Sequence, residues 1–310
     1  MIADSDKIVL VRPQGGLNDT LVQIEKCCSY AEISGRKVIV DTAYAGSYTF
    51  HDALSNYFDS RQRGLILDAS KFEVSKARDV FPNHLSGRLG DYRTFYKNDC
   101  CVDLIKGEPI TFDFKKNYTE RVVVHHQFGG GDSSSFFQRV FLKPELQKRL
   151  SERLARLAPS YVGVHIRNTD YQSDFRKFID EMVANGLFKN RRVFFATDSE
   201  EALHYIKAHV TDALHVEFTQ ADLQGNQPLH RRPNNDQIYW KESNSEAILD
   251  LLTLAYSNKI FTAPIQSATH ATDAIPSSVK FSGFVRLAIQ LQAQRPLLTQ
   301  FTGIRGWLDL

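Results

Sequence analysis

His165 and Arg167 are the pair of residues best suited to bind an anionic ligand. They lie two positions apart at the end of the apolar run YVGVHI, so in a strand their side chains point the same way. A guanidinium can hold a phosphate through two parallel charge-assisted hydrogen bonds. The alternative is a structural ion pair between Arg167 and Asp170 or another neighbour. Asn168 and Asp170 are further candidates for ligand contacts at this position.

Two carboxylates also stand in unusual places. Asp198 ends the apolar run RVFFATD, where it either contacts a ligand or caps the helix that begins with Ser199. Asp250 interrupts an apolar helical run, and a buried carboxylate without a partner is costly. Guanine offers two adjacent N–H donors that one carboxylate can accept. Asp250 is therefore either a guanine contact or an exposed residue on the outer face of its helix.

Two turns supply the other candidate residues. Gly15 and Gly16 are candidate donor-binding residues, because two glycines let the backbone approach a ligand closely and the helix behind them presents N–H groups to an anion. A purely structural turn is the alternative. The spacing is not GxGxxG and no Walker lysine follows, so a dinucleotide or P-loop site is excluded. Asn18 or Asp19 is placed to cap this helix. Gln266 and Ser267, in a turn after a strand, are suited to contact a phosphate or a ribose.

Other classes of function are not favoured. The 38 basic and 36 acidic residues give no basic face for nucleic acid. His125 and His126 are adjacent and face opposite sides of a strand, and no DxD or GxSxG sequence occurs, so neither a metal site nor a serine hydrolase is expected. No secretory signal is expected, because the run Ile8–Val11 is too short for its apolar core, and no stretch reaches about 18 apolar residues. Its four cysteines form two adjacent pairs, typical of reduced thiols, and we expect a cytoplasmic protein without a transmembrane segment.

The elements that position these residues alternate between strand and helix in both halves of the chain. Helices are predicted from Leu17 onward, over 144–157, and over 245–258 with a cap at Ser243 or Ser245. Residues 45–118 show no assignable order. The fold class is therefore α/β with parallel sheets, in two domains, 1–155 and 156–310, the last helix being free to pack back on the first. Strands are predicted at 7–12, 37–41, 121–128, 161–166, 192–198, 214–218 and 259–264.

The second half resembles the α-1,6-fucosyltransferases, the family of the bacterial nodulation and animal core fucosyltransferases. The resemblance lies in VGVHIRNTD, FFATDSEEAL and SEAILDLLTLAYSNKIFTAPIQSATHA, and in the N-terminal GGLNDTLVQIEKCCSYAEISGRKVIVD. It covers about residues 10–45 and 140–275. It implies a GT-B fold, in which two Rossmann-like domains face each other across a cleft. The acceptor would bind mainly to the first domain and the GDP-sugar to the second. The family inverts configuration and uses no metal.

The resemblance also implies roles for individual residues. Arg167 matches the arginine that holds the donor β-phosphate, and His165 matches a histidine of the donor site. Asp250 matches the acid that reads guanine, and Ser267 matches a phosphate contact.

The chain departs from the family pattern at two positions. Asn168 stands where a second arginine is usual. Phe175 stands where the animal enzyme has its proposed acid/base glutamate. The adjacent Asp174 is then the expected base, with Asp170 and Asp19 as alternatives.

The predicted function is an inverting, metal-independent transfer of a sugar, fucose by the resemblance, from a GDP donor to a glycan hydroxyl. Arg167 and Asp174 are the expected catalytic residues. The partners would be a nucleotide sugar and a glycan acceptor in glycan biosynthesis, with no other cofactor. The alternatives are a GT-B transferase for another nucleotide sugar and a non-catalytic nucleotide- or glycan-binding protein of the same fold.

Overall fold

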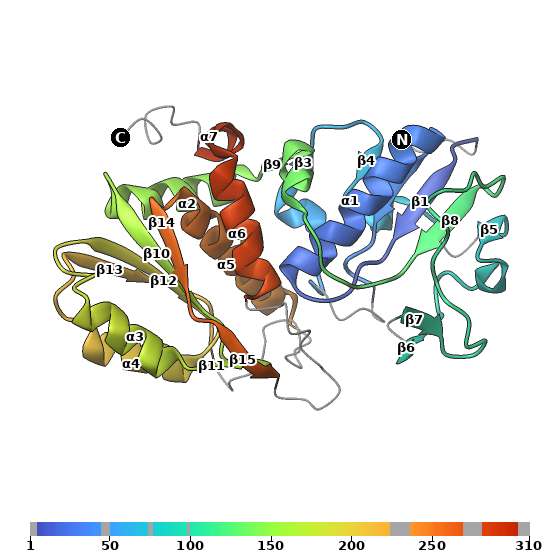
Figure 1. Cartoon of the computed structure of the whole chain (residues 1–310). Helices are drawn as coiled ribbons and strands as arrows, with labels where there is room; N and C mark the ends of the chain where they lie inside the picture. Colours follow the sequence, from blue (N-terminus) through green and yellow to red (C-terminus); the bar gives the residue numbers. More distant parts are fainter. Residues whose placement is uncertain are drawn as a thin grey trace. The chain divides into compact units, whose positions relative to one another are not determined.

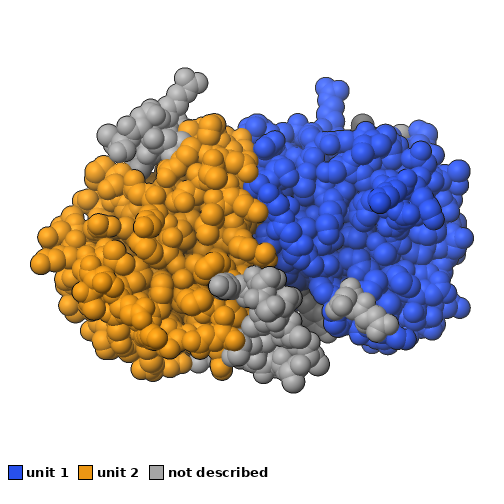
Figure 2. All heavy atoms as spheres, in the orientation of Figure 1, with its two compact units in different colours: residues 1–143 blue, residues 144–310 orange. Residues whose placement is uncertain are grey.

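Two parallel sheets, one in each half of the chain, organise the structure (Figure 1). It is a computed structural model that describes residues 5–44, 50–73, 77–97, 100–223, 236–268 and 281–302. The chain divides into two compact units, Met1–Lys143 and Pro144–Leu310, coloured separately in Figure 2. The boundary comes before the expected one after residue 155, because the helix over 144–157 packs against a helix of the second unit.

The first unit contains a five-stranded parallel sheet in the order β4-β2-β1-β8-β5. The central strands β1 and β8 consist of β-branched and other residues that are all buried, as expected for strands covered on both faces. Its elements are β1 (Ile8–Val11), α1 (Leu17–Ser34), β2 (Lys37–Val40), η1 (Leu54–Asn56), β3 (Phe58–Ser60), β4 (Leu65–Ile66), η2 (Ala69–Lys71), β5 (Val80–Phe81), η4 (Asn83–Leu85), β6 (Thr94–Lys97), β7 (Cys100–Asp103), β8 (Val122–His125), η5 (Ser134–Gln138) and β9 (Val140–Leu142).

The second unit contains a four-stranded parallel sheet in the order β13-β12-β10-β14. Its elements are α2 (Pro144–Leu157), β10 (Tyr161–Ile166), β11 (Tyr171–Ser173), α3 (Phe175–Ala184), β12 (Arg192–Thr197), α4 (Glu200–His209), β13 (His215–Phe218), α5 (Gln237–Tyr256), β14 (Lys259–Thr262), β15 (Ile265–Ala268), α6 (Gly283–Ala293) and α7 (Arg295–Thr302).

Helices cover both faces of the second sheet. Val164 and Ile166 of β10 belong to a core shared with α3 and α4. Gly163 points to the other face, where a Cβ atom would lie 2.9 Å from Ser257 Oγ and 3.0 Å from Leu254 Cδ2. A glycine here therefore lets α5 pack closely on the sheet. The side chains of β10 alternate between the two faces, and His165 shares the α5 side with Gly163.

The predicted strands all form, and α2 and β10 have the predicted bounds. The predicted caps were wrong for two helices. Gly16, in an extended conformation, is the N-cap of α1, so Asn18 and Asp19 fall in the first turn. Helix α5 begins at Gln237 and is capped by Asp236, so Ser243 and Ser245 lie inside it. A cap must have non-helical backbone angles before the first turn, and these residues come too late in the chain.

The last helices pack within the second unit, where α6 contacts α5, and α7 contacts both α2 and α5. No helix in the described ranges is both long and apolar enough to cross a bilayer.

All four cysteines are unpaired thiols, and burial raises the pKa of Cys28 and of Cys101 to about 12.

Candidate functional site

The point where the strand order reverses in the second sheet lies between β10 and β14. From β10 the chain proceeds to β12 and β13 on one side, then returns through α5 to β14 on the other. In open parallel sheets, ligands bind beyond the carboxyl ends of the strands at this point. His165 of β10 pairs with Thr262 of β14 here. Their side chains are hydrogen-bonded, with His165 Nδ1 3.3 Å from Thr262 Oγ1.

His165 is a buried, neutral residue. Burial, and then the positive charge of Arg167, lower its pKa to about 3. Its ring stacks on Phe284 of α6, with the centroids 5.6 Å apart. A neutral imidazole at this position can donate or accept one hydrogen bond to a ligand, but it adds no charge.

Arg167 directly follows β10 and is held by two carboxylates. Its Nε donates to Asp170 Oδ1 at 2.8 Å and lies 3.0 Å from Asp198 Oδ2. Burial alone would lower the pKa of Arg167, but the charges of Asp198 and Asp170 raise it. The structural ion pair between Arg167 and Asp170, the alternative to phosphate binding, is thus present. The guanidinium has five N–H donors, and its Nη1 makes no hydrogen bond to any residue that the structure describes. Its side chain is 20% exposed.

Asp198 organises the loop after β10. Its two oxygens accept hydrogen bonds from Asn168 N at 2.9 Å and from Thr169 Oγ1 at 2.6 Å. It does not cap the following helix, because Ser199 does so by accepting from Ala202 N. The Asp198 carboxylate therefore turns toward the end of β10 and fixes the loop that carries Arg167.

The strands β11 and β15 join the loops that follow β10 and β14. They pair antiparallel, with Gln172 opposite Ser267. This pairing places the backbone of Ser267 beside the loop that carries Arg167 and Asn168. Gln266 and Ser267 therefore lie in a strand and not in the predicted turn. Gln266 is exposed in β15. The side chain of Ser267 lies outside the described parts of the structure.

Asp174 is the N-cap of α3. Its exposed carboxylate accepts a hydrogen bond from Lys177 N at 3.2 Å. A side-chain oxygen at this position satisfies one of the backbone N–H groups that the first helical turn leaves without a partner. The residue expected to act as the base thus also has a structural function.

Asp250 is buried and belongs to a network that the sequence analysis did not predict. Arg153 of α2 donates to Asp250 Oδ1 at 2.7 Å and to Glu246 Oε2 at 2.6 Å. Thr219, after β13, donates to the other oxygen of Asp250. The outward-facing interpretation of Asp250 is therefore wrong, since helix α2 covers it. Burial raises the pKa of Asp250 to about 6.

The position of Arg153 in the sequence indicates that it could reach a buried carboxylate. It lies three positions after Leu150 and four before Leu157, on the edge of the apolar stripe of α2. An arginine on such an edge can reach a buried carboxylate of a facing helix.

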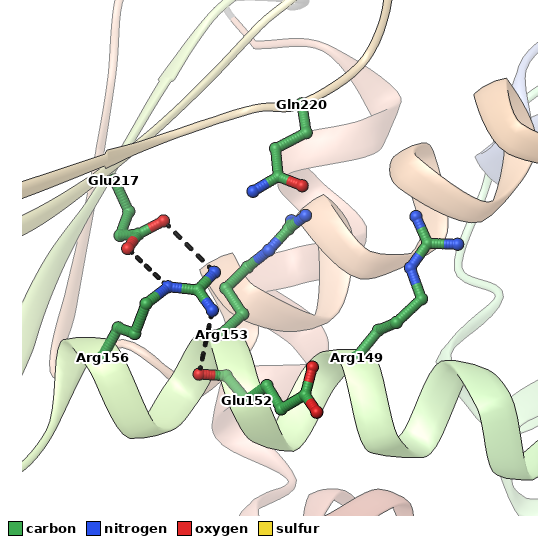
Figure 3. Close-up of a pocket in the computed structure, with 6 residues that line it drawn as sticks. All are labelled: Arg149, Glu152, Arg153, Arg156, Glu217 and Gln220. Atoms are coloured by element: carbon green, nitrogen blue, oxygen red, sulfur yellow. Dashed lines mark hydrogen bonds and ion pairs between the residues drawn. The ribbon is translucent and has the colours of Figure 1, made fainter.

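A cavity of about 450 Å³ adjoins this network (Figure 3). Arg149, Arg153 and Arg156 project into it from one side of α2, and Glu217 comes from β13. Each guanidinium is paired with a carboxylate: Arg156 lies 2.7 Å from Glu217, and Arg149 contacts Glu242 and Glu246. Because these charges compensate one another, the cavity is a poor site for a phosphate. Its lining is Arg149, Glu152, Arg153, Arg156, Glu217 and Gln220.

The remaining candidates lie in the first unit. Gly15 has a φ of +102°, and a Cβ atom there would lie 2.8 Å from Asp19 Oδ2, so this turn requires glycine. Gly16 caps α1.

The two adjacent histidines diverge, as predicted. His125 Nε2 lies 2.9 Å from Gln23 Oε1, whereas His126 Nδ1 lies 2.9 Å from the hydroxyl of Tyr92. Across the described ranges, no group of three or more His, Cys, Asp or Glu residues is placed to hold a metal ion.

Comparisons with known proteins show what the fold is. No protein-family model and no curated protein sequence matches the chain. Among solved structures, it is similar to the NodZ α-1,6-fucosyltransferase soaked with GDP-fucose, with 18% identity, a TM-score of 0.58 and 93% of each chain covered. NodZ from Bradyrhizobium gives a TM-score of 0.60 at 18% identity over 92% of this chain and 93% of that one. FUT1 of Arabidopsis thaliana, a mutant in complex with GDP, gives 0.50 at 9% identity over 93% of this chain and 69% of that one.

The chain therefore has the fold of the GT-B fucosyltransferases, as the resemblance implied. At these identities the likeness extends to the fold alone. The function must be argued from the residues of this chain.

Proposed function

We propose that this protein is a glycosyltransferase that transfers fucose from GDP-fucose to a glycan hydroxyl, with inversion of configuration and without a metal ion. The observation that carries the proposal is the placement of His165 and Arg167. Both lie at the carboxyl end of β10, where the strand order of the second sheet reverses. The neighbours of the same fold have GDP or GDP-fucose in their structures.

Arg167 would stabilise the leaving group. In the proposed displacement, the acceptor oxygen bonds to the anomeric carbon while the bond from that carbon to the β-phosphate oxygen breaks. The negative charge that develops on GDP needs a positive partner. Asp170 and Asp198 already orient the guanidinium of Arg167 through Nε and Nη2, so Nη1 can meet the phosphate without reorganisation.

Other residues would complete the donor site. His165 would contact the donor as a neutral imidazole, and Gln266 and Ser267 would bind phosphate or ribose from β15. Asp174 would accept the proton of the acceptor hydroxyl, with Asp170 and Asp19 as the alternative bases.

The assignment of Asp250 to guanine requires a change of partners. Both of its oxygens are engaged, by Arg153 and by Thr219. To accept from guanine N1–H and the exocyclic amine, the carboxylate must share or release these donors. This observation favours a second candidate function, which is transfer from a nucleotide sugar with a different base.

A thermal-shift panel of GDP, UDP, CMP and ADP tests the proposal, since a ligand that binds only the native state raises stability by mass action. We expect GDP alone to raise the unfolding temperature, with EDTA changing nothing. Stabilisation by UDP or CMP but not GDP would establish the second candidate. Loss of the GDP effect on adding EDTA would contradict the metal-independent mechanism.

A further inference from the structure

The two faces of the β6–β7 hairpin (Figure 1) have different surroundings. Side chains alternate between the faces along each strand. Thr94 and Asp103 pair across the hairpin and share one face, where Thr94 accepts from Gln14 Nε2 at 3.4 Å and Asp103 is fully buried. Phe95 lies on the opposite face and is 37% exposed. The face that carries Phe95 is therefore the outer face of the hairpin.

Two further apolar side chains extend the outer face. Leu104 N donates to Arg93 O at 2.8 Å, so the pairing of the two chain segments continues past the end of β7. Leu104 is therefore a diagonal neighbour of Phe95 on the outer face, and it is 54% exposed. Ile105, which follows, is 71% exposed. Single exposed apolar side chains are ordinary, whereas a group of neighbouring ones indicates a surface that binds a partner.

The turn that carries Leu104 and Ile105 is held by the buried Asp103. One carboxylate oxygen of Asp103 accepts from Ile105 N at 2.8 Å, and the other accepts from Arg88 Nη1 at 2.9 Å. The backbone oxygen of Asp103 accepts from Gly107 N at 2.7 Å. The two apolar side chains thus stand at the surface in a fixed turn, so binding through them requires little further ordering.

The charged residues on the outer face and in the turn are basic. Arg93 and Lys97 flank Phe95 on this face, two positions before it and two after it. Lys106 follows Ile105 in the turn, and all three basic residues are exposed. A surface with apolar side chains among basic ones is complementary to a partner that offers negative charge at its boundary and apolar groups beneath it.

The acids near this surface do not cancel its charge. Within the described residues 93–97 and 100–107, the acid is Asp103, which is buried and paired with Arg88. Glu108, directly after this stretch, lies 3.2 Å from His84 Nδ1. Asp91, which comes before it, is exposed. The three basic residues outnumber these two flanking acids.

We propose that the outer face of the β6–β7 hairpin and the turn 104–106 dock the protein onto a membrane surface that contains anionic phospholipids. The apolar side chains enter the boundary between headgroups and acyl chains, and the basic ones contact the headgroup phosphates. Lysine suits this partner, because its stem lies along apolar groups while the ammonium stays at the headgroups, whereas protein–protein interfaces are depleted in lysine. This inference goes beyond the proposed transfer reaction and does not depend on it. The docking residues are Arg93, Phe95, Lys97, Leu104, Ile105 and Lys106.

Co-sedimentation of the full-length protein with vesicles tests this surface. We expect the protein to pellet with vesicles of phosphatidylglycerol and phosphatidylcholine in equal parts, and to remain in solution with phosphatidylcholine alone. About 1 M NaCl should release it, because the screening length falls to about 3 Å. Leu104→Ser with Ile105→Ser should weaken binding at least about tenfold, because apolar surface is no longer removed from water. Lys97→Ala with Lys106→Ala should weaken it about thirtyfold, because two attractions to the anionic surface are lost.

Two single variants are the controls. Ile33→Ser removes an apolar side chain that is 87% exposed on α1, and Lys148→Ala removes a lysine that is 78% exposed on α2. Both should bind the mixed vesicles like the unaltered protein. All four variants change exposed side chains, so their unfolding temperatures should match that of the unaltered protein.

The proposal is overturned if the mixed vesicles do not pellet the protein, if both kinds of vesicle bind it equally, or if a control variant loses as much as a hairpin variant. Light scattering tests the other occupant. A dimer that Leu104→Ser with Ile105→Ser dissociates would assign the patch to a second copy of the chain and contradict membrane docking. GDP stabilisation measured on the same samples separates this surface from the donor site. A protein that binds the mixed vesicles through the hairpin but is not stabilised by GDP would contradict the donor assignment and support the present one.

Discussion

Arg153 Nη1 lies 2.7 Å from Asp250 Oδ1, and both side chains are almost fully buried. The two residues stand on α2 and α5, 97 positions apart in the chain. Arg153 also contacts Glu246, one turn earlier on α5. Two buried carboxylates thus share one guanidinium. For Asp250, the effect of burial on the pKa outweighs that of the Arg153 charge.

Asp250→Asn should change the pH dependence of stability. The folded protein holds the Asp250 proton up to about pH 6, whereas the unfolded chain releases it near pH 4. The folded state binds more protons in this window, so stability falls as pH rises through it. Urea unfolding should show the unaltered protein losing about 2 kcal/mol relative to the variant between pH 4 and 7. If the difference instead grows with pH, Arg153 dominates and the carboxylate is charged throughout.

The same variant tests whether Asp250 contacts guanine. Asparagine replaces one acceptor oxygen with a donor that would face a guanine donor. By the proposed function, calorimetry should show GDP affinity falling by about one to two orders of magnitude, since the mismatch costs roughly 1–3 kcal/mol. Pyrophosphate, which has no base, is the control. Equal losses of affinity for GDP and for pyrophosphate would mean that Asp250 supports the pocket through Arg153. Unchanged GDP affinity would show that Asp250 does not contact the donor.

Arg167→Ala should abolish transfer and weaken GDP binding by roughly 1.5–3 kcal/mol, the typical value of a hydrogen bond to a charged group. It also leaves Asp170 buried without its guanidinium partner, so stability should fall as well. The double variant Arg167→Ala with Asp170→Asn removes the carboxylate charge that Arg167 had compensated. It should recover stability but not GDP affinity. Recovery of GDP binding in the double variant would show that Arg167 acts only by pairing with Asp170.

Asp174→Asn separates the capping function from the catalytic one. Asparagine caps a helix about as well as aspartate but cannot take up a proton at neutral pH. If Asp174 is the base, kcat should fall at least about a hundredfold with little change in unfolding temperature. Asp174→Ala should in addition lose about 1 kcal/mol of stability. Full activity in the asparagine variant would transfer the assignment to Asp170 or Asp19.

His165→Asn should make the protein less sensitive to acid. Because the folded pKa of His165 is about 3, the unfolded state binds its proton first as pH falls below about 6.5. This linkage costs about 2 kcal/mol at pH 5. The stability of the unaltered protein should therefore fall more steeply from pH 7 to 5 than that of the variant. The exposed His204 provides the control, and His204→Asn should follow the unaltered curve.

The local elements could be predicted from the sequence by itself. Tyr161–Ile166 is a run of strand-forming residues, and Pro144–Leu157 carries leucines at helical spacing, so each forms as expected. The same patterns indicated two parallel sheets, and they placed His165 and Arg167 at a strand end. Strand and helix periodicities arise from neighbours in the chain, which is why they can be seen without a structure.

The partners of the charged residues were decided only by the tertiary structure. Asp198 could cap its own helix, but the loop after β10 captures it through Asn168 and Thr169. Asp250 could face solvent, but α2 covers it and brings Arg153. Tyr96 and Phe128 come together because a hairpin folds over the end of β8. Each of these contacts joins residues about 30 or more positions apart in the chain. The energy of a buried charge or ring depends on the groups around it, and only the packing of the elements determines which groups those are.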